Sequence, residues 1–286
     1  MNLAIVGSGV TGQATGRGLA RHGHKPVFYD IDDSKLTLLK ESGYEISRSL
    51  SSAVQESDIV FVCVPTPTVD GSMSFSYVED AVTSVAKALE GTRKYRVIVV
   101  RSTVLPSTTR CRVIPILEKH SRMKVGEDFG VCMNPEFLRE KSAFQDFLNP
   151  ERIVIGEHDA RSGNMLEKVY SGFDAPLIRT DLDTAEMIKY AANLFLASKI
   201  SFFNEIHMIC NRLRLDSEVI SEAVSLDSRI GKYGTVGGRP FDGKCLPKDL
   251  EAFRTFARSI NVNPKLLDAI SIINEQIVSS EKLNGG

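Results

Sequence analysis

The 286-residue sequence predicts two domains of different classes: an α/β domain with a doubly wound parallel sheet over residues 1–182, and an all-helical domain over residues 183–286. In the first part, short continuous apolar runs alternate with amphipathic stretches. That alternation is typical of parallel strands buried on both faces between helices. From about residue 181 the apolar spacing is helical and no strand signal remains, which predicts the second domain.

The elements of both domains follow from these patterns. The expected strands are Leu3–Val6, Val27–Tyr29, Ile59–Val64, Val97–Val100, Phe129–Met133 and Ile153–Ile155. The expected helices of the first domain are Gln13–Arg21, Lys35–Glu41, Tyr77–Leu89 and Thr108–Lys119. Residues 184–212 contain neither glycine nor proline and predict one long helix, on which Met187, Tyr190, Ala191, Leu194 and Phe195 would form an apolar face. The expected helices that follow it are Asp216–Ser225, with Asp216 as N-cap, Lys248–Ile260 and Pro264–Leu283.

The composition narrows the class of protein. A net charge of −1 with 42% hydrophobic residues is ordinary for a globular protein and argues against a nucleic-acid-coating protein. No apolar stretch approaches the ~20 residues of a membrane span, and no leader precedes the first strand, so we expect a cytoplasmic protein without membrane partners.

The five cysteines favour neither a disulfide framework nor a zinc site, because their number is odd and no CxxC pair exists. We expect Cys63, Cys111, Cys132 and Cys210 to be small buried hydrophobes. Cys245 differs, because it lies beside Lys244 and near a helix start, and both features favour a thiolate.

A glycine motif follows the first strand directly. Gly7, Gly9 and Gly12 form a GxGxxG pattern that opens a helix. In a Rossmann domain these glycines allow a tight turn, the approach of a pyrophosphate and close helix–strand packing, while an acid at the end of the next strand binds the ribose. Asp30 occupies that position and favours NAD over NADP. The alternative is a plain glycine turn with a capping acid.

Four further segments carry side chains suited to the stepwise oxidation of an alcohol. They are Arg101–Pro106, Asn134–Glu140, the pair Lys189 and Asn193 on one helix face, and Phe241–Asp249. Each also has an ordinary interpretation as a turn, a solvated lysine or an inert cysteine. Together they supply what an aldehyde needs to be oxidised further, a thiol that adds to its carbon and is later released by hydrolysis.

The order of motifs GxGxxG, VPTPT, STV, NPEFLRE, FLNPERIVIG, KxxxN, RIG and CLPKD resembles the UDP-glucose/GDP-mannose dehydrogenase family from Leu3 to about Asn274. The resemblance implies an NAD-dependent enzyme that oxidises a nucleotide sugar to the carboxylate through a cysteine-bound thiohemiacetal and thioester. It also implies a homodimer built on the long helix, in which Arg229 reaches the neighbouring subunit's substrate.

The resemblance assigns three sets of residues and no metal. The catalytic set is Cys245 as nucleophile, Lys189 and Asn193 at the oxyanion, Thr103 and Asp249 at a water, and Glu140 in proton transfer. The cofactor set is Gly7, Gly9, Val10, Gly12, Asp30, Lys35, Pro65, Thr66, Thr103 and Glu136. The substrate set is Phe137, Leu138, Arg139, Lys189, Asn193, Arg229 and Gly243.

The sequence departs from the family pattern at several positions. Asp242 and Ser107 stand where glycine is usual, Ser74 replaces a common aspartate, and Gln276 replaces a basic residue. The sequence ends at Gly286, where the family continues into a second Rossmann-like domain, so the identity of the substrate is the most open question. Two alternatives remain at this point, a two-electron β-hydroxyacid-type dehydrogenase and a non-catalytic NAD-binding paralogue.

Overall fold

The computed structural model describes residues 1–243 and 245–284, and they form two compact units. The α/β unit contains Met1–Thr66 and Ser74–Lys189, and the helical unit contains Pro67–Met73 and the chain from Tyr190 onward. The division falls inside the long helix, seven residues later than the sequence suggests (189 against 182), because the first turns of that helix pack on the sheet. A Cβ atom at Gly156 in the sheet would lie 2.6 Å from the Ala185 side chain.

The sheet of the α/β unit has the strand order β10-β9-β8-β7-β4-β1-β2-β3. Its strands are β1 Asn2–Val6, β2 Lys25–Tyr29, β3 Glu45–Ile46, β4 Ile59–Val62, β7 Val97–Val100, β8 Gly130–Met133, β9 Ile153–Glu157 and β10 Leu177–Asp181. All residues of β4, β7 and β8 are buried, as expected of central parallel strands.

One strand pair corrects the expectation of a parallel sheet. β8 and β9 pair antiparallel, and β10 pairs parallel to β9, so β9 and β10 run against the other strands. The connection from β8 passes through the short helix α6, Ala143–Leu148, which packs against α1. The chain therefore enters β9 from the carboxyl edge of the sheet instead of crossing to the opposite edge.

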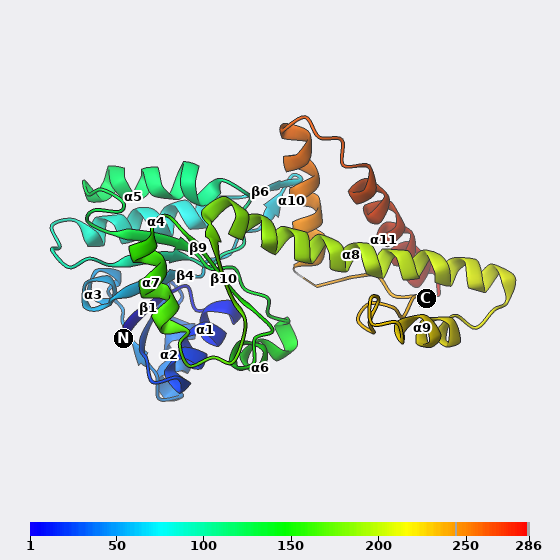
Figure 1. The fold of residues 1–286 in the computed structure, drawn as a ribbon, viewed down its shortest axis with the longest axis horizontal. Coiled ribbons are helices and arrows are strands. Elements are labelled where there is room, and N and C mark those ends of the chain that lie inside the picture. Colours follow the sequence, from blue (N-terminus) through cyan, green and yellow to red (C-terminus); the bar gives the residue numbers. More distant parts are fainter. Residues whose placement is uncertain (244, 285–286) are drawn as a thin grey trace. The chain divides into compact units, whose positions relative to one another are not determined.

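Helices cover both faces of this sheet (Figure 1). They are α1 Val10–Arg21, α2 Asp33–Glu41, α3 Leu50–Glu56, α4 Ser76–Leu89, α5 Ile114–Ser121, α6 and α7 Ala160–Val169. A π-helical turn, Thr109–Val113, leads into α5, and a 3-10 turn, Glu140–Ser142, leads into α6. The helices α3, α4 and α5 contact one another in succession, whereas α1 pairs with α6.

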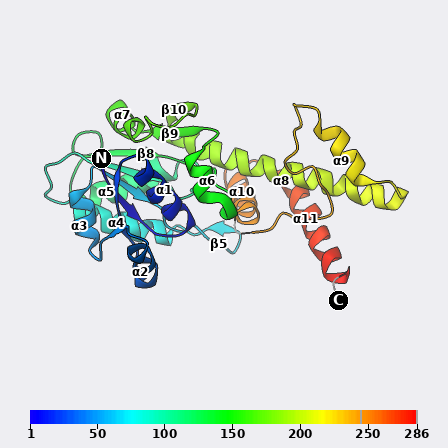
Figure 2. The same ribbon diagram turned by 90° about the horizontal axis from the view of Figure 1, so that it is seen from below.

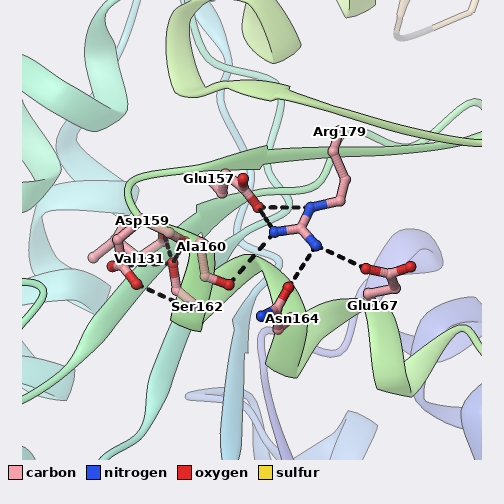
Figure 3. A network of polar contacts seen from close by, with 8 residues as sticks. All are labelled: Val131, Glu157, Asp159, Ala160, Ser162, Asn164, Glu167 and Arg179. Atoms are coloured by element: carbon pink, nitrogen blue, oxygen red, sulfur yellow. Dashed lines mark hydrogen bonds and ion pairs between the residues drawn. The ribbon is translucent and has the colours of Figure 1, made fainter.

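An arginine network fastens the antiparallel edge of the sheet (Figure 3). Arg179 on β10 donates from Nε to Glu157 Oε2 on β9 at 2.9 Å, and from Nη1 to Asn164 Oδ1 at 2.6 Å and Glu167 Oε2 at 2.8 Å on α7. Gly163 makes room for this network, since a Cβ atom there would lie 1.5 Å from Glu157 Oε2. The network therefore joins β9 and the edge strand β10 to the helix α7 that covers them.

The helical unit is built from one hairpin and four helices of the described chain (Figure 2). These elements are β5 Thr68–Val69, β6 Ser72–Met73, α8 Leu182–Leu213, whose first turns belong to the α/β unit, α9 Ser217–Ser225, α10 Leu246–Ser259 and α11 Lys265–Asn284. The hairpin, which the sequence did not predict, contacts α10, and Thr68 Oγ1 donates to Lys248 O at 3.0 Å. Asp216 is the N-cap of α9, as predicted, and accepts from Glu218 N–H at 2.9 Å.

Burial was predicted for four cysteines and is confirmed for three of them. Cys63, Cys132 and Cys210 are buried, and burial raises the pKa of Cys63 and Cys132 to about 12. The prediction for Cys111 is wrong, because its side chain is exposed. It lies in the π-helical turn, which directs Thr109 and Val113 inward and leaves Cys111 on the outer side.

The apolar face expected for α8 is only partly buried in the single chain. Tyr190 and Leu194 are buried, whereas Met187 is 41% and Phe195 66% exposed. Among the residues that the structure describes, no helix has both the length and the apolar character needed to cross a membrane.

Candidate active site

The glycine loop between β1 and α1 has the conformation that a dinucleotide-binding turn requires. Gly7 has a φ of +96°, and a Cβ atom there would lie 2.8 Å from Cys63 O. A Cβ atom at Gly12 would lie 1.9 Å from Gly7 O, so any side chain would separate α1 from the loop. Gly9 has open space at its Cβ position. The first and third glycines are thus needed for the turn and its packing, and the second leaves the backbone accessible.

The start of α1 is suited to an anion. Gly9 is the N-cap of α1, and no side chain caps this helix. The first N–H groups of α1 therefore face outward, beside the half-exposed side chain of Val10. Asp30 follows β2, and its largely buried carboxylate accepts from Ser8 N–H at 2.6 Å. Lys35 Nζ lies 3.6 Å from the same carboxylate. The acid is therefore held against the glycine loop, where a ribose would meet it.

Two strand-end loops lie next to each other at the carboxyl edge of the sheet. Ser102, after β7, donates from its hydroxyl to Val64 O, after β4, at 2.6 Å. Beside this bond, Pro65 is exposed, Thr66 is buried and Thr103 is half-buried. The parallel pairing of β4 with β7 brings these candidate cofactor residues together.

A buried arginine that the sequence analysis did not assign organises the same edge. Arg101 Nε donates to Thr15 Oγ1 on α1 at 2.7 Å, and Nη1 donates to Asn134 O at 3.2 Å. Asn134 Nδ2 in turn donates to Val154 O on β9 at 2.7 Å. The signal in the sequence was an arginine directly after an apolar strand. These bonds fix the backbone at the start of the segment 134–140.

Glu136 and Lys189 form a buried ion pair with 3.0 Å between Oε1 and Nζ. Burial by itself raises the pKa of Glu136, but the Lys189 charge and the N–H of Leu138, 2.6 Å from Oε2, together lower that pKa below its ordinary value. The centroid of the Phe137 ring lies 5.6 Å from Lys189 Nζ and 3.8 Å from Arg152 Cζ. Glu136 is therefore a buried carboxylate whose negative charge is paired with the Lys189 side chain.

The two other candidates of this segment are exposed. Arg139 pairs with Asp146, and its guanidinium hydrogen bond is the largest of the contacts that lower the pKa of Asp146 to about 2. Glu140 begins the 3-10 turn that follows. Neither lies in the buried part of the segment with Glu136.

The helical unit places Asn193, Asp249 and Cys245 at one helix start. Asp249 is 1% exposed, and its Oδ2 accepts from Asn193 Nδ2 at 2.6 Å. Lys248 Nζ lies 2.5 Å from the other oxygen, Oδ1. Asp249 N–H donates to Cys245 O at 2.9 Å, and Cys245 is the exposed N-cap of α10. Lys244, expected to assist the thiol, lies outside the described residues.

The remaining substrate candidates lie in the loop before α10. Arg229 is exposed and pairs with Asp227 of its own loop. Lys199 on α8 holds this loop by donating to Ile230 O at 2.6 Å. Gly243 has a φ of +76°, which favours glycine. Within the described part of the chain, no group of three or more His, Cys, Asp or Glu side chains could hold a metal ion.

Comparison with known proteins gives concordant matches. Residues 37–174 match the NAD binding domain of the UDP-glucose/GDP-mannose dehydrogenase family, and residues 183–276 match its central domain. A GDP-mannose 6-dehydrogenase of Pseudomonas putida is 36% identical over 98% of this chain and 69% of its own length. The UDP-glucose 6-dehydrogenase TuaD of Bacillus subtilis is 38% identical over 96% of this chain and 63% of its own length.

Solved structures of the same family also match this chain. A UDP-glucose dehydrogenase from Pyrobaculum islandicum aligns with a TM-score of 0.90 and 37% identity over 96% of this chain and 68% of that chain. A GDP-mannose dehydrogenase from Pseudomonas aeruginosa aligns with a TM-score of 0.79 and 33% identity over 98% of this chain and 69% of that chain. The chain thus spans about two thirds of the length of these relatives.

The sheet, the glycine loop and the acid after β2 define a dehydrogenase that uses NAD. Within that class, the chain belongs to the UDP-glucose/GDP-mannose dehydrogenase family.

Proposed function

We propose that this protein oxidises the primary alcohol of a nucleotide sugar to the carboxylate in two successive two-electron steps. The observation that carries the proposal is the exposed thiol of Cys245 at the start of α10, whose first turn contains the buried Asp249, which accepts from Asn193 on α8. The two-electron alternative requires no thiol at this position. The names of the relatives, which are UDP-glucose and GDP-mannose 6-dehydrogenases, support a nucleotide sugar as substrate.

The cofactor residues fit NAD. The glycine loop and the start of α1 would hold the pyrophosphate, Asp30 and Lys35 the adenosine ribose, and Pro65, Thr66, Thr103 and Glu136 the nicotinamide end. NAD, when bound, accepts the hydride in each oxidation. Asp30 favours NAD over NADP, because a carboxylate repels a 2′-phosphate.

The chemistry at the substrate carbon is assigned to the chain's own groups. The Cys245 thiolate adds to the aldehyde produced by the first oxidation and forms a thiohemiacetal, which the second oxidation converts into a thioester. The Lys189 ammonium and the Asn193 amide stabilise the oxyanion of each tetrahedral adduct. Thr103 and Asp249 position the water that hydrolyses the thioester, Glu140 assists the proton transfer, and the thiolate is the leaving group.

The substrate residues proposed from the family resemblance fall into two groups. Phe137, Leu138, Arg139 and Gly243 would contact the sugar and the phosphates, and the cationic loop with Arg229, Lys232 and Arg239 would face the anionic part. The test is a comparison of the specificity constants of a UDP-sugar, a GDP-sugar and the matching sugar 1-phosphate, with NADH formation as the readout. No NADH from any of them would contradict the proposal, and turnover of a β-hydroxyacid instead would support a two-electron enzyme.

We also propose that two copies of the chain pair through α8. Its exposed side carries an apolar stripe with helical spacing, and these side chains are 41–66% exposed in the single chain: Met187, Phe195, Phe202, Ile209 and Leu213. An isologous two-fold contact is the common way to bury such a surface. Arg229, 87% exposed at its side chain, could then reach the partner's substrate.

Subunit mixing tests this arrangement. Arg229→Ala and Cys245→Ser subunits, each inactive alone, should recover part of the wild-type activity when mixed, because some sites would receive an intact copy of both residues. Heterodimers that form without recovering activity would contradict the shared site, and a monomer in solution would contradict the dimer.

A further inference from the structure

The backbone just before Cys245 is held by asparagine side chains. Asn204, fully buried on α8, accepts from Gly238 N–H at its Oδ1 and donates from its Nδ2 to Arg239 O, both at 2.8 Å. One amide therefore satisfies a donor and an acceptor of the loop, as a neighbouring strand would.

A second asparagine makes the same pair of bonds to Phe241, four residues before Cys245. Asn274 on α11 accepts from Phe241 N–H at 2.9 Å and donates to Phe241 O at 3.2 Å. The Phe241 side chain is 5% exposed, so this residue is anchored through its ring as well as its backbone. The two amides come from different helices and hold consecutive parts of one irregular segment.

Two glycines bring the loop close enough to α8 for these bonds. A Cβ atom at Gly237 would lie 2.4 Å from Phe203 O, and Gly238 has a φ of +91°. The loop therefore lies directly on the helix backbone, and it has no room to move toward α8.

Cys245 is consequently bounded by a fixed point on each side in the sequence. Phe241 is fixed by Asn274, and Asp249 N–H donates to Cys245 O at 2.9 Å. Loss of the upstream anchor would remove the bonds that fix the backbone of Phe241, and Gly243, with a φ of +76°, follows two residues later.

We propose that Asn204 and Asn274 are positioning residues that set the location of the Cys245 thiol for attack on the substrate carbon. The inference rests on the proposed function, since it takes Cys245 as the nucleophile. An amide to alanine change leaves two partly buried backbone groups of the loop without the side-chain partners they have in the wild type, so the loop can relax. Because a shift of about 1 Å in a reacting group can cost ~100-fold in rate, the effect belongs to kcat and not to cofactor affinity.

The experiment uses the full chain with Asn204→Ala, Asn274→Ala and the isosteric Asn274→Asp, which keeps the acceptor for Phe241 N–H but sets an oxygen against Phe241 O. Gln276→Ala, an exposed amide on the same helix, is the matched control. Cys245 is probed with iodoacetamide over a range of pH in a Cys111→Ser background, because Cys111 is the other exposed cysteine.

We expect kcat for a UDP-sugar to fall by about 10- to 100-fold in the three variants, and the pH profile of Cys245 alkylation to change. The Kd for NADH should stay within about two-fold of wild type, because the cofactor residues lie in the α/β unit. Gln276→Ala should match wild type in every readout.

A wild-type kcat per folded molecule with an unchanged alkylation profile would overturn the inference, even if the melting temperature falls, since the amides would then only stabilise the fold. If the variant at one asparagine does not fold, the variant at the other asparagine provides the test, because each asparagine holds a different part of the loop. Failure of the proposed function gives a different result: Cys245→Ser would itself remain active.

Discussion

The buried pair Glu136–Lys189 gives a prediction whose sign depends on pH. Lys189→Met removes the ammonium and leaves the Glu136 carboxylate in a site where its side chain is 11% exposed. Burial, the largest influence on the pKa of Glu136, then acts with only the Leu138 N–H and the more distant Arg101 charge opposing it, so that pKa should rise above its ordinary value.

The magnitude follows from breaking a buried ion pair, which costs about 3–5 kcal/mol when one charge stays behind. In the wild type the pKa of Glu136 is lowered, so the pair stabilises the protein above the ordinary glutamate pKa and loses this effect only as the pH falls through the folded-state value. In the variant the raised pKa reverses the sign, and stability falls as the pH rises past the ordinary value. The deficit relative to wild type should therefore be larger at about pH 8 than at about pH 5.

The assay is urea denaturation followed by far-UV circular dichroism, since the chain contains no tryptophan. The double variant Lys189→Met/Glu136→Gln is the control, because its neutral amide can still accept from Leu138 N–H. This double variant should recover most of the lost stability but should remain inactive. A single variant as stable as wild type at both pH values, or a double variant no better than the single one, would refute this reasoning.

Three further predictions follow from single residues. Asp30→Asn should weaken NAD binding and reduce the preference over NADP, as measured by the Kd values of both cofactors; a purified wild type that prefers NADP would contradict the role of Asp30. Gly12→Ala should abolish NAD binding, because its Cβ atom would lie 1.9 Å from Gly7 O, and unchanged binding by calorimetry would show that the turn adapts. Burial raises the pKa of Glu186 to about 7, so wild-type stability should fall as the pH rises from the ordinary value through 7; Glu186→Gln, which still accepts from Thr109 N–H, should gain about 2–4 kcal/mol above that pH, and an equal pH slope in both proteins would contradict this.

The sequence predicted the parts of the fold that short-range patterns determine. The central strands are continuous apolar runs, and the glycine loop needs a positive φ at Gly7 and the absence of a Cβ atom at Gly12, so both were predictable. The strand β10 was missed because it lies at the sheet edge, where Arg179 interrupts the apolar pattern. The antiparallel pairing of β8 with β9 depends on where the connecting chain packs, which periodicity does not encode.

The sequence yields site candidates where the chemistry of a residue type is distinctive, as for Cys245, Lys189 and Asp30, and their roles remain predictions. The supporting contacts were not, because an asparagine that holds a loop, such as Asn204 or Asn274, has no sequence pattern that separates it from a solvated one. Which of the two carboxylates, Glu136 or Glu140, is buried beside Lys189 likewise became visible only with the packing of α8 on the segment 134–140.

The four-electron mechanism is tested most directly by the ratio of NADH formed to carboxylate produced, measured on the purified wild type and Cys245→Ser with UDP-glucose as the probe. The account predicts two NADH per carboxylate for the wild type and no carboxylate from Cys245→Ser, because the second oxidation requires the thiohemiacetal. One NADH per product, or a fully active Cys245→Ser variant, would contradict it.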